Sequence, residues 1–146
     1  MERREFVKST CNTCLLIAAG YFLPKLSSCT PAKFATFKTE VINKQIIVPL
    51  SAFANANMQL VQPKGWYYNI AVQKKNDNSF SALLLQCTHQ ENQLTPTSDG
   101  FNCSLHGSDF DKNGNVRKGP AEQHLQEYKT SVIDNNLIIQ ILKTPQ

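Results

Sequence analysis

The sequence has little charge, and no stretch of it concentrates charge of one sign. Lys, Arg, Asp and Glu make up 18% of the 146 residues, and the formal net charge is +4. Beyond residue 28 there are 11 basic and 9 acidic residues, and no group of lysines or arginines forms a stripe. A nucleic-acid-binding surface needs such a stripe to neutralise phosphates. The composition therefore excludes nucleic acid as an expected partner.

The chain also has too few cysteines to be a disulfide-stabilised protein. The five are Cys11, Cys14, Cys29, Cys87 and Cys103. Three of them lie within the first 29 residues, and the other two, Cys87 and Cys103, each belong to a motif with a nearby histidine, so none is left over for a structural disulfide. The sequence contains no internal repeat and no low-complexity segment, and its length fits one domain.

The N-terminal part of the sequence has no apolar run long enough to span a membrane. The run Cys14–Leu23 has ten residues and is stopped by Pro24 and Lys25. A helix that spans a bilayer needs about 20 residues, whereas ten fit the apolar region of a signal peptide. The alternative interpretation is a retained N-terminal anchor helix.

The residues on either side of this run resemble an export signal. The segment 3–8 (RREFVK) is similar to the twin-arginine pattern R-R-x-F-[LV]-K, with Glu2 in place of the usual Ser or Thr. The segment 26–29 (LSSC) resembles a lipobox, whose Cys becomes the lipidated first residue of the mature protein. We therefore expect a signal peptide at 1–28, lipidation of Cys29 and a tether at 29–36. The protein would be exported across the bacterial cytoplasmic membrane and lipid-anchored on its periplasmic side.

From residue 37 onward, the pattern indicates an all-β protein. Short apolar and β-branched runs alternate with turns of Gly, Pro and Asn. The predicted strands are 37–42, 45–49, 58–61, 66–72, 80–86, 126–132 and 137–142. The first two are expected to form a hairpin across Asn43-Lys44, and the last two a hairpin across residues 134–136. Many short strands with such turns favour an antiparallel barrel or sandwich.

Two short Cys and His motifs lie between the fifth and sixth predicted strands. Cys87-Thr88-His89 is followed, after thirteen residues, by Cys103-Ser104-Leu105-His106-Gly107. Thiolate and imidazole together favour zinc or an iron–sulfur cluster. A structural zinc site is the plainer interpretation, although zinc motifs usually pair cysteines with cysteines and histidines with histidines.

The order and spacing of these motifs resemble the Rieske [2Fe–2S] family, whose pattern is C-x-H, a spacer and C-x-x-H-G. The segment 107–111 (GSDFD) and the segment 119–121 (GPA) continue the resemblance. The resemblance implies a Rieske-like base of antiparallel β-sheets, with a small cluster-binding subdomain inserted at about 87–120 of a domain at 37–146. It also implies one [2Fe–2S] cluster per chain. The implied ligands are Cys87, His89, Cys103 and His106.

The surrounding residues match the family only in part. Ser108 stands where a family serine donates to a bridging sulfide, whereas Phe110 stands where quinol-oxidising members have a tyrosine that donates to a ligand sulfur. Those members also have an additional cysteine in each loop, and here the positions hold Asn92 and Leu105. The resemblance thus implies a lower reduction potential than in quinol-oxidising subunits.

We therefore expect a one-electron transfer protein or subunit, with a redox protein as partner and no small-molecule substrate. No acid–base pair or nucleophile indicates catalysis by this chain alone. Two alternatives remain, a Rieske subunit of a quinol:cytochrome oxidoreductase and a structural zinc-binding lipoprotein.

Overall fold

The computed structural model describes residue 34, residues 36–76 and residues 79–145. The predicted signal peptide, most of the tether and Cys29 lie outside the described residues. Within the described part, no helix is both long and apolar enough to cross a membrane.

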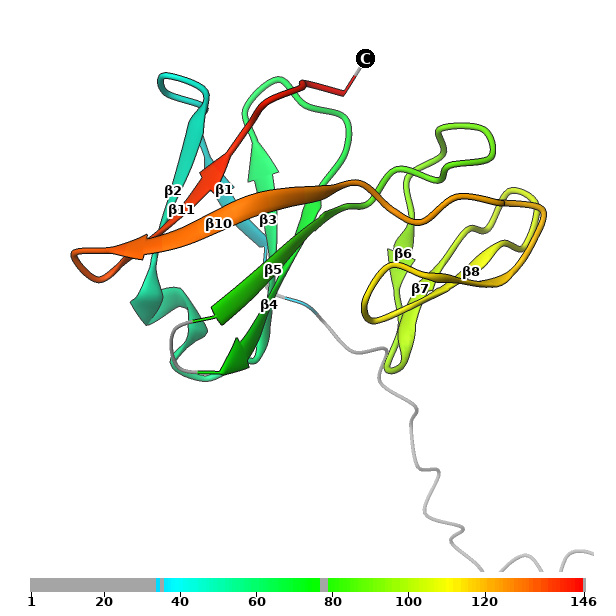
Figure 1. The fold of residues 1–146 in the computed structure, drawn as a ribbon, viewed down its shortest axis with the longest axis horizontal. Helices are drawn as coiled ribbons and strands as arrows, with labels where there is room; N and C mark the ends of the chain where they lie inside the picture. The colour runs from blue at the N-terminus through cyan, green and yellow to red at the C-terminus, as the bar shows by residue number, and fades with distance from the viewer. Residues whose placement is uncertain (1–33, 35, 77–78, 146) are drawn as a thin grey trace, which may run out of the picture. The chain divides into compact units, whose positions relative to one another are not determined.

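The described residues form eleven strands and one short 3₁₀ helix (Figure 1). These are β1 (Thr36–Thr39), β2 (Gln45–Pro49), η1 (Leu50–Phe53), β3 (Met58–Pro63), β4 (Ile70–Asn76), β5 (Ser79–Leu84), β6 (Thr95–Pro96), β7 (Gly100–Asn102), β8 (Asp109–Asp111), β9 (Val116–Lys118), β10 (Glu127–Ile133) and β11 (Asn136–Gln140). The all-β class is confirmed.

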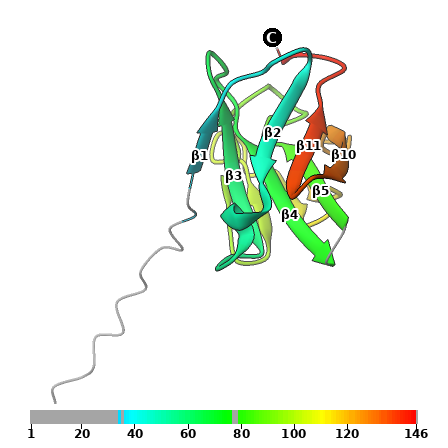
Figure 2. The same cartoon turned by 90° about the vertical axis from the view of Figure 1, so that its left-hand side faces the viewer.

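Seven strands form the larger sheet, in the order β1-β3-β4-β5-β10-β11-β2. The sheet curves into a nearly closed barrel, as the turned view in Figure 2 shows. All its pairs are antiparallel except β1 with β3, which run parallel. Its interior is filled by a core cluster that includes Ile46, Val48, Ile70 and Leu137, all of them fully buried. Burying these branched side chains is the main stabilising term of the base.

The smaller sheet is inserted between two neighbouring strands of the larger one. It has the order β6-β7-β8-β9 and is antiparallel throughout. The chain leaves the base after β5 and returns at β10, and these two strands pair with each other through Tyr128↔Ala82 and Glu127↔Leu83. Figure 1 shows the small sheet beside the base. An inserted subdomain of this kind is what the family resemblance implies.

A second core cluster joins the two sheets. It includes Leu83 and Leu85 on the base side and Phe101 and Phe110 on the small sheet. Gly114, in the turn between β8 and β9, has φ of +83°, and a Cβ there would lie 3.1 Å from that of Leu125. Only glycine adopts this conformation without strain, and its lack of a side chain lets the turn pack closely.

The predicted first hairpin is wrong. Only one bridge, between Ile42 and Gln45, joins its two halves. Asn43 and Lys44 form the turn with positive φ, but beyond it β1 pairs with β3 and β2 pairs with β11. The strands diverge because each finds a longer partner elsewhere in the barrel. The predicted strand 66–72 also begins later, at Ile70, since the backbone N–H of Trp66 closes a turn onto the carbonyl of Pro63.

The last hairpin is confirmed. Strands β10 and β11 pair from Lys129↔Gln140 to Ile133↔Asn136. The turn residues Asp134 and Asn135 have φ of 47° and 61°. Asp and Asn tolerate this left-handed conformation, and it matches the twist of a tight hairpin.

Candidate metal centre

The first candidate loop follows β5 and carries Cys87 and His89. The backbone N–H of Glu91 donates to the carbonyl of Cys87 at 2.8 Å, and the N–H of Cys87 donates to the carbonyl of Asn92 at 2.8 Å. Glu91 has a positive φ of 52°, which is uncommon for a residue other than glycine. The hydroxyl of Tyr68, a buried residue of the base core, donates to the Glu91 carbonyl at 2.5 Å. This bond holds the loop against the base.

The second candidate loop joins β7 to β8 and has the same backbone pattern. The N–H of Gly107 donates to the carbonyl of Cys103 at 2.9 Å, and the N–H of Cys103 donates to the carbonyl of Ser108 at 2.9 Å. Gly107 has a positive φ of 77°. The two loops are thus matched turns in which the fourth residue after each cysteine has positive φ. By this equivalence Asn92 of the first loop corresponds to Ser108 of the second.

The structure brings the two cysteines together in the interior. Cys87 is 1% exposed and Cys103 is 2% exposed, and both are free thiols. Burial raises the pKa of Cys103, but the backbone N–H groups of Leu105 and His106 donate hydrogen bonds to its sulfur. The side chains of Cys87 and Asn92 add further hydrogen bonds, and together these donors lower the pKa of Cys103 below its ordinary value. The site therefore favours a thiolate at this position.

The two histidines lie together on the surface. The ring centroids of His89 and His106 are 5.0 Å apart, and the ring planes are inclined at 80°. Both residues are exposed. The four side chains thus form two pairs, one of buried sulfurs and one of exposed imidazoles. Among the described residues, no three Cys, His, Asp or Glu side chains gather closely enough to hold one metal ion.

Ser108 and Phe110 are both buried beside this arrangement. Ser108 is 0% exposed, and its Oγ accepts the backbone N–H of Ala121 at 3.0 Å. Its hydroxyl hydrogen is therefore directed elsewhere and can donate. Phe110 is also 0% exposed and packs in the same cluster as Cys87 and Cys103.

Sequence reasoning missed the role of Asn92. It treated this residue only as the position of an absent cysteine, but the side-chain Nδ2 lies 3.7 Å from the Sγ of Cys103 and donates to it. The missed signal is that the fifth residue after each cysteine is polar, Asn92 in one loop and Ser108 in the other.

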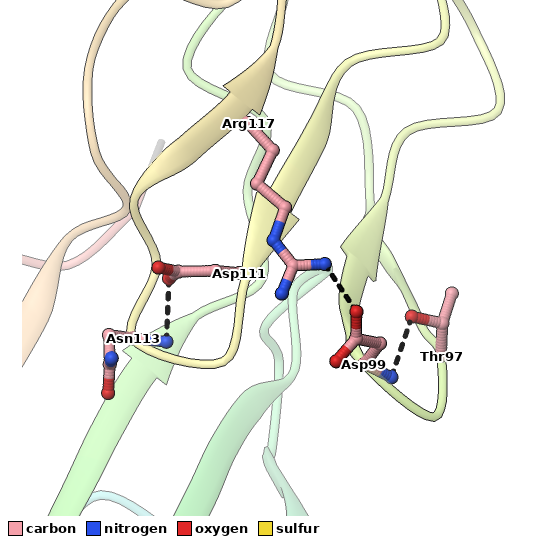
Figure 3. Close-up of polar contacts among 5 residues, drawn as sticks. All are labelled: Thr97, Asp99, Asp111, Asn113 and Arg117. Atoms are coloured by element: carbon pink, nitrogen blue, oxygen red, sulfur yellow. Dashed lines mark hydrogen bonds and ion pairs between the residues drawn. The ribbon is translucent and has the colours of Figure 1, made fainter.

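Polar contacts at the end of the small sheet away from the second candidate loop link its strands and turns (Figure 3). Arg117 of β9 forms an ion pair with Asp99, which lies in the turn between β6 and β7; its guanidinium nitrogen is 2.6 Å from a carboxylate oxygen of Asp99. The hydrogen bond from Arg117 holds the pKa of the Asp99 carboxyl below its usual value. At the end of β8, slight burial raises the pKa of Asp111, but hydrogen bonds from Asn115 and Asn113 outweigh it and lower that pKa.

A family model described as Rieske [2Fe-2S] domain matches residues 43–129. No curated protein matches the chain significantly.

Three solved structures are similar to the chain. One is the plasma membrane Rieske protein PetC3 from the cyanobacterium Synechocystis PCC 6803, with 28% identity over 66% of this chain and 86% of that one, and a TM-score of 0.45. Another is a chain from the complex of reduced oxygenase and oxidized ferredoxin in carbazole 1,9a-dioxygenase, with 20% identity, coverage of 72% and 100%, and a TM-score of 0.51. A third is naphthalene 1,2-dioxygenase with indole bound in its active site, with 24% identity, coverage of 53% and 22%, and a TM-score of 0.42. The second supports the fold.

Proposed function

The chain belongs to the Rieske [2Fe-2S] domain family and carries one such cluster, and we propose that Cys87, His89, Cys103 and His106 hold it. The protein is an electron-transfer protein of this family. The observation that carries the ligand assignment is the sorting of the four side chains into a sulfur pair and an imidazole pair. In Rieske centres two histidines replace two cysteines on one of the two irons.

The donors present fit such a cluster better than a single zinc ion. A closed zinc site gathers four ligands around one point, whereas here the buried thiols and the exposed rings form separate pairs. The N–H groups directed at the Cys103 sulfur favour its thiolate, which is the form that binds iron. When bound, the cluster takes up and releases one electron.

The protein's own residues determine where that electron enters and leaves. The cysteine side lies in the core, and the histidine side is exposed. A redox protein that docks on the loop tips therefore contacts His89 and His106, together with Leu105, which is 53% exposed. An exposed apolar residue beside two polar rings suits a transient protein partner. The proposed function involves a redox protein as partner and no small-molecule substrate.

Ser108 keeps one of the family's hydrogen-bond donors to the cluster, whereas Phe110 lacks the other. The Oγ of Ser108 accepts the N–H of Ala121, which leaves its hydroxyl hydrogen available to donate to a sulfur of the proposed cluster. Phe110 has no hydrogen to donate to a sulfur. Since donors stabilise the more negative reduced state, this combination favours a potential below that of quinol-oxidising members. The described residues also lack the disulfide that braces the tip in those members.

Export and membrane anchoring are the remaining part of the proposal. They are supported by the twin-arginine-like segment 3–8 and the lipobox-like segment 26–29 alone. A cluster is inserted where thiols are reduced, so the protein must cross the membrane folded. A lipidated Cys29 would then hold it at the periplasmic side of the cytoplasmic membrane, since several acyl chains anchor a protein where one is marginal.

The test compares two cysteine variants of the full chain. Cys103→Ala is expected to abolish the red-brown chromophore and the electron paramagnetic resonance (EPR) signal of the reduced protein, because a buried ligand is lost. Cys29→Ser is the matched control, expected to keep both signals and to lose the acyl mass and the membrane fraction. A fully loaded Cys103→Ala protein, or a wild type that binds zinc without iron, would refute the ligand assignment. An unmodified Cys29 in the mature wild type would refute the anchoring.

A further inference from the structure

The side chain of Asn92 reaches from the first loop to the ligand sulfur of the second. Its Nδ2 lies 3.7 Å from the Sγ of Cys103 and 3.2 Å from the carbonyl of Gln93. We propose that Asn92 positions the Cys103 sulfur and raises the reduction potential of the cluster. This inference rests on the proposed function, because it requires Cys103 to be a ligand.

The backbone of Asn92 fixes where its amide points. Its carbonyl accepts the N–H of Cys87 at 2.8 Å, so the residue closes the first ligand turn. The side chain is half-buried, and its amide also donates to the carbonyl of Gln93. The equivalence of the two loops adds a second argument. Ser108, the corresponding residue of the other loop, is fully buried and also turns its polar group inward.

The donor set around the Cys103 sulfur comes from both loops. The backbone N–H groups of Leu105 and His106 approach it from its own loop, and the Asn92 amide approaches it from the other. The amide therefore connects the two loops at a point where the chain has no disulfide between them. It also acts on the sulfur electrostatically, which a covalent brace at the loop tips does not.

The sign of the effect follows from charge. Reduction adds one negative charge to the cluster, and part of that charge lies on the cysteine sulfurs. A hydrogen-bond donor to a sulfur then stabilises the reduced form more than the oxidised form. Removing the donor lowers the midpoint potential, and placing a carboxylate at the same position lowers it further.

The experiment measures the potentials of Asn92→Ala and Asn92→Asp in the purified, cluster-loaded full chain. Aspartate keeps the shape of asparagine but replaces the N–H donor by a negative charge. Asn92→Asp therefore tests the electrostatic effect on the sulfur without the cavity that Asn92→Ala leaves. Asn102→Ala is the matched control, because Asn102 is also half-buried and neighbours Cys103 in sequence but makes no hydrogen bond to its sulfur among the described residues. We expect midpoint potentials in the order wild type, Asn92→Ala, Asn92→Asp, from highest to lowest, with Asn102→Ala close to wild type.

Resonance Raman spectra give a readout that a purely structural role would not change. The iron–sulfur stretching bands of wild type are expected to shift in Asn92→Ala and not in Asn102→Ala. Unchanged potentials and bands in loaded Asn92 variants would overturn the proposal. If neither variant loads, pulsed EPR of reduced wild type labelled with ¹⁵N at the asparagine amide decides, since the proposal requires a coupling to that nitrogen and its absence contradicts it. A wild type without any [2Fe–2S] spectrum would instead refute the proposed function.

Discussion

Replacing Phe110 by tyrosine adds one hydroxyl to a ring that is buried beside the proposed ligands. Phe110 is 0% exposed in β8, and it packs in the same cluster as Cys87 and Cys103. The family resemblance implies that a tyrosine hydroxyl at this position points at the sulfur of Cys87. A donor there stabilises the reduced cluster more than the oxidised one, so the potential should rise.

The expected size follows from the strength of one hydrogen bond. A net hydrogen bond contributes about 0.5–1.5 kcal/mol, and for a one-electron couple about 1.4 kcal/mol corresponds to roughly 59 mV. The shift is therefore about 20–60 mV upward. The competing outcome is a buried hydroxyl without a partner, which leaves the potential unchanged and lowers the free energy of unfolding by about 1–3 kcal/mol.

Potentiometric titration of the cluster signal and denaturant unfolding together separate these outcomes. Phe101→Tyr is the matched control, because Phe101 pairs with Phe110 across β7 and β8 and is 1% exposed. We expect it to lose stability without gaining potential. An intact spectrum with an unchanged potential in Phe110→Tyr would show that this ring edge faces away from the ligand sulfur.

Three further predictions concern the support of the loops. Gly114→Ala should lower the free energy of unfolding by about 1–3 kcal/mol, because φ of +83° strains any other residue; wild-type stability in denaturant would contradict this. Tyr68→Phe removes the hydrogen bond to the Glu91 carbonyl and should lower the free energy of unfolding by about 0.5–1.5 kcal/mol. Hydrogen exchange at the Glu91 amide should also become faster; unchanged exchange would count against the role of Tyr68 in holding the first loop against the base. The pKa values of Asp99 and Asp111 are lowered from 3.8, so their stabilisation is present above that pH and is lost as the pH falls through the folded values. The free energy of unfolding, measured between about pH 6 and pH 2, should show this loss. The double variant Asp99→Asn, Asp111→Asn should lose less stability over the same range; an equal loss in the double variant would show that these two carboxylates do not cause it.

The fold was predictable where the pairing is local. The hairpin of β10 and β11 follows from two apolar runs around a turn of Asp and Asn, whose left-handed conformations the sequence itself favours. The pairing of β1 with β3 was not predictable in this way, because each residue of β1 pairs with one 24 positions further along, as in Thr36↔Leu60, and no turn signals it. The aromatic residues Trp66 and Tyr68 indicated a strand by propensity, but they pack against the core beside β4.

The candidate site shows the same division between local and non-local information. The motif in each loop, through the family resemblance, predicts which cysteines and histidines lie together, and in the structure the two ring centroids are 5.0 Å apart. Their role as cluster ligands stays a prediction. The contact between Asn92 and Cys103 crosses from one loop to the other, so no spacing within either loop contains it.

The insertion of the small sheet between β5 and β10 has a consequence for the order of folding. These strands pair directly, so the base holds both ends of the intervening segment close together. Ordering a long segment is less costly in chain entropy once its ends are already joined. The barrel can thus form first and act as a template on which the loops close. Iron would then meet a chain whose scaffold is already complete, and loss of iron would loosen the small sheet while the strand pairs of the barrel persist.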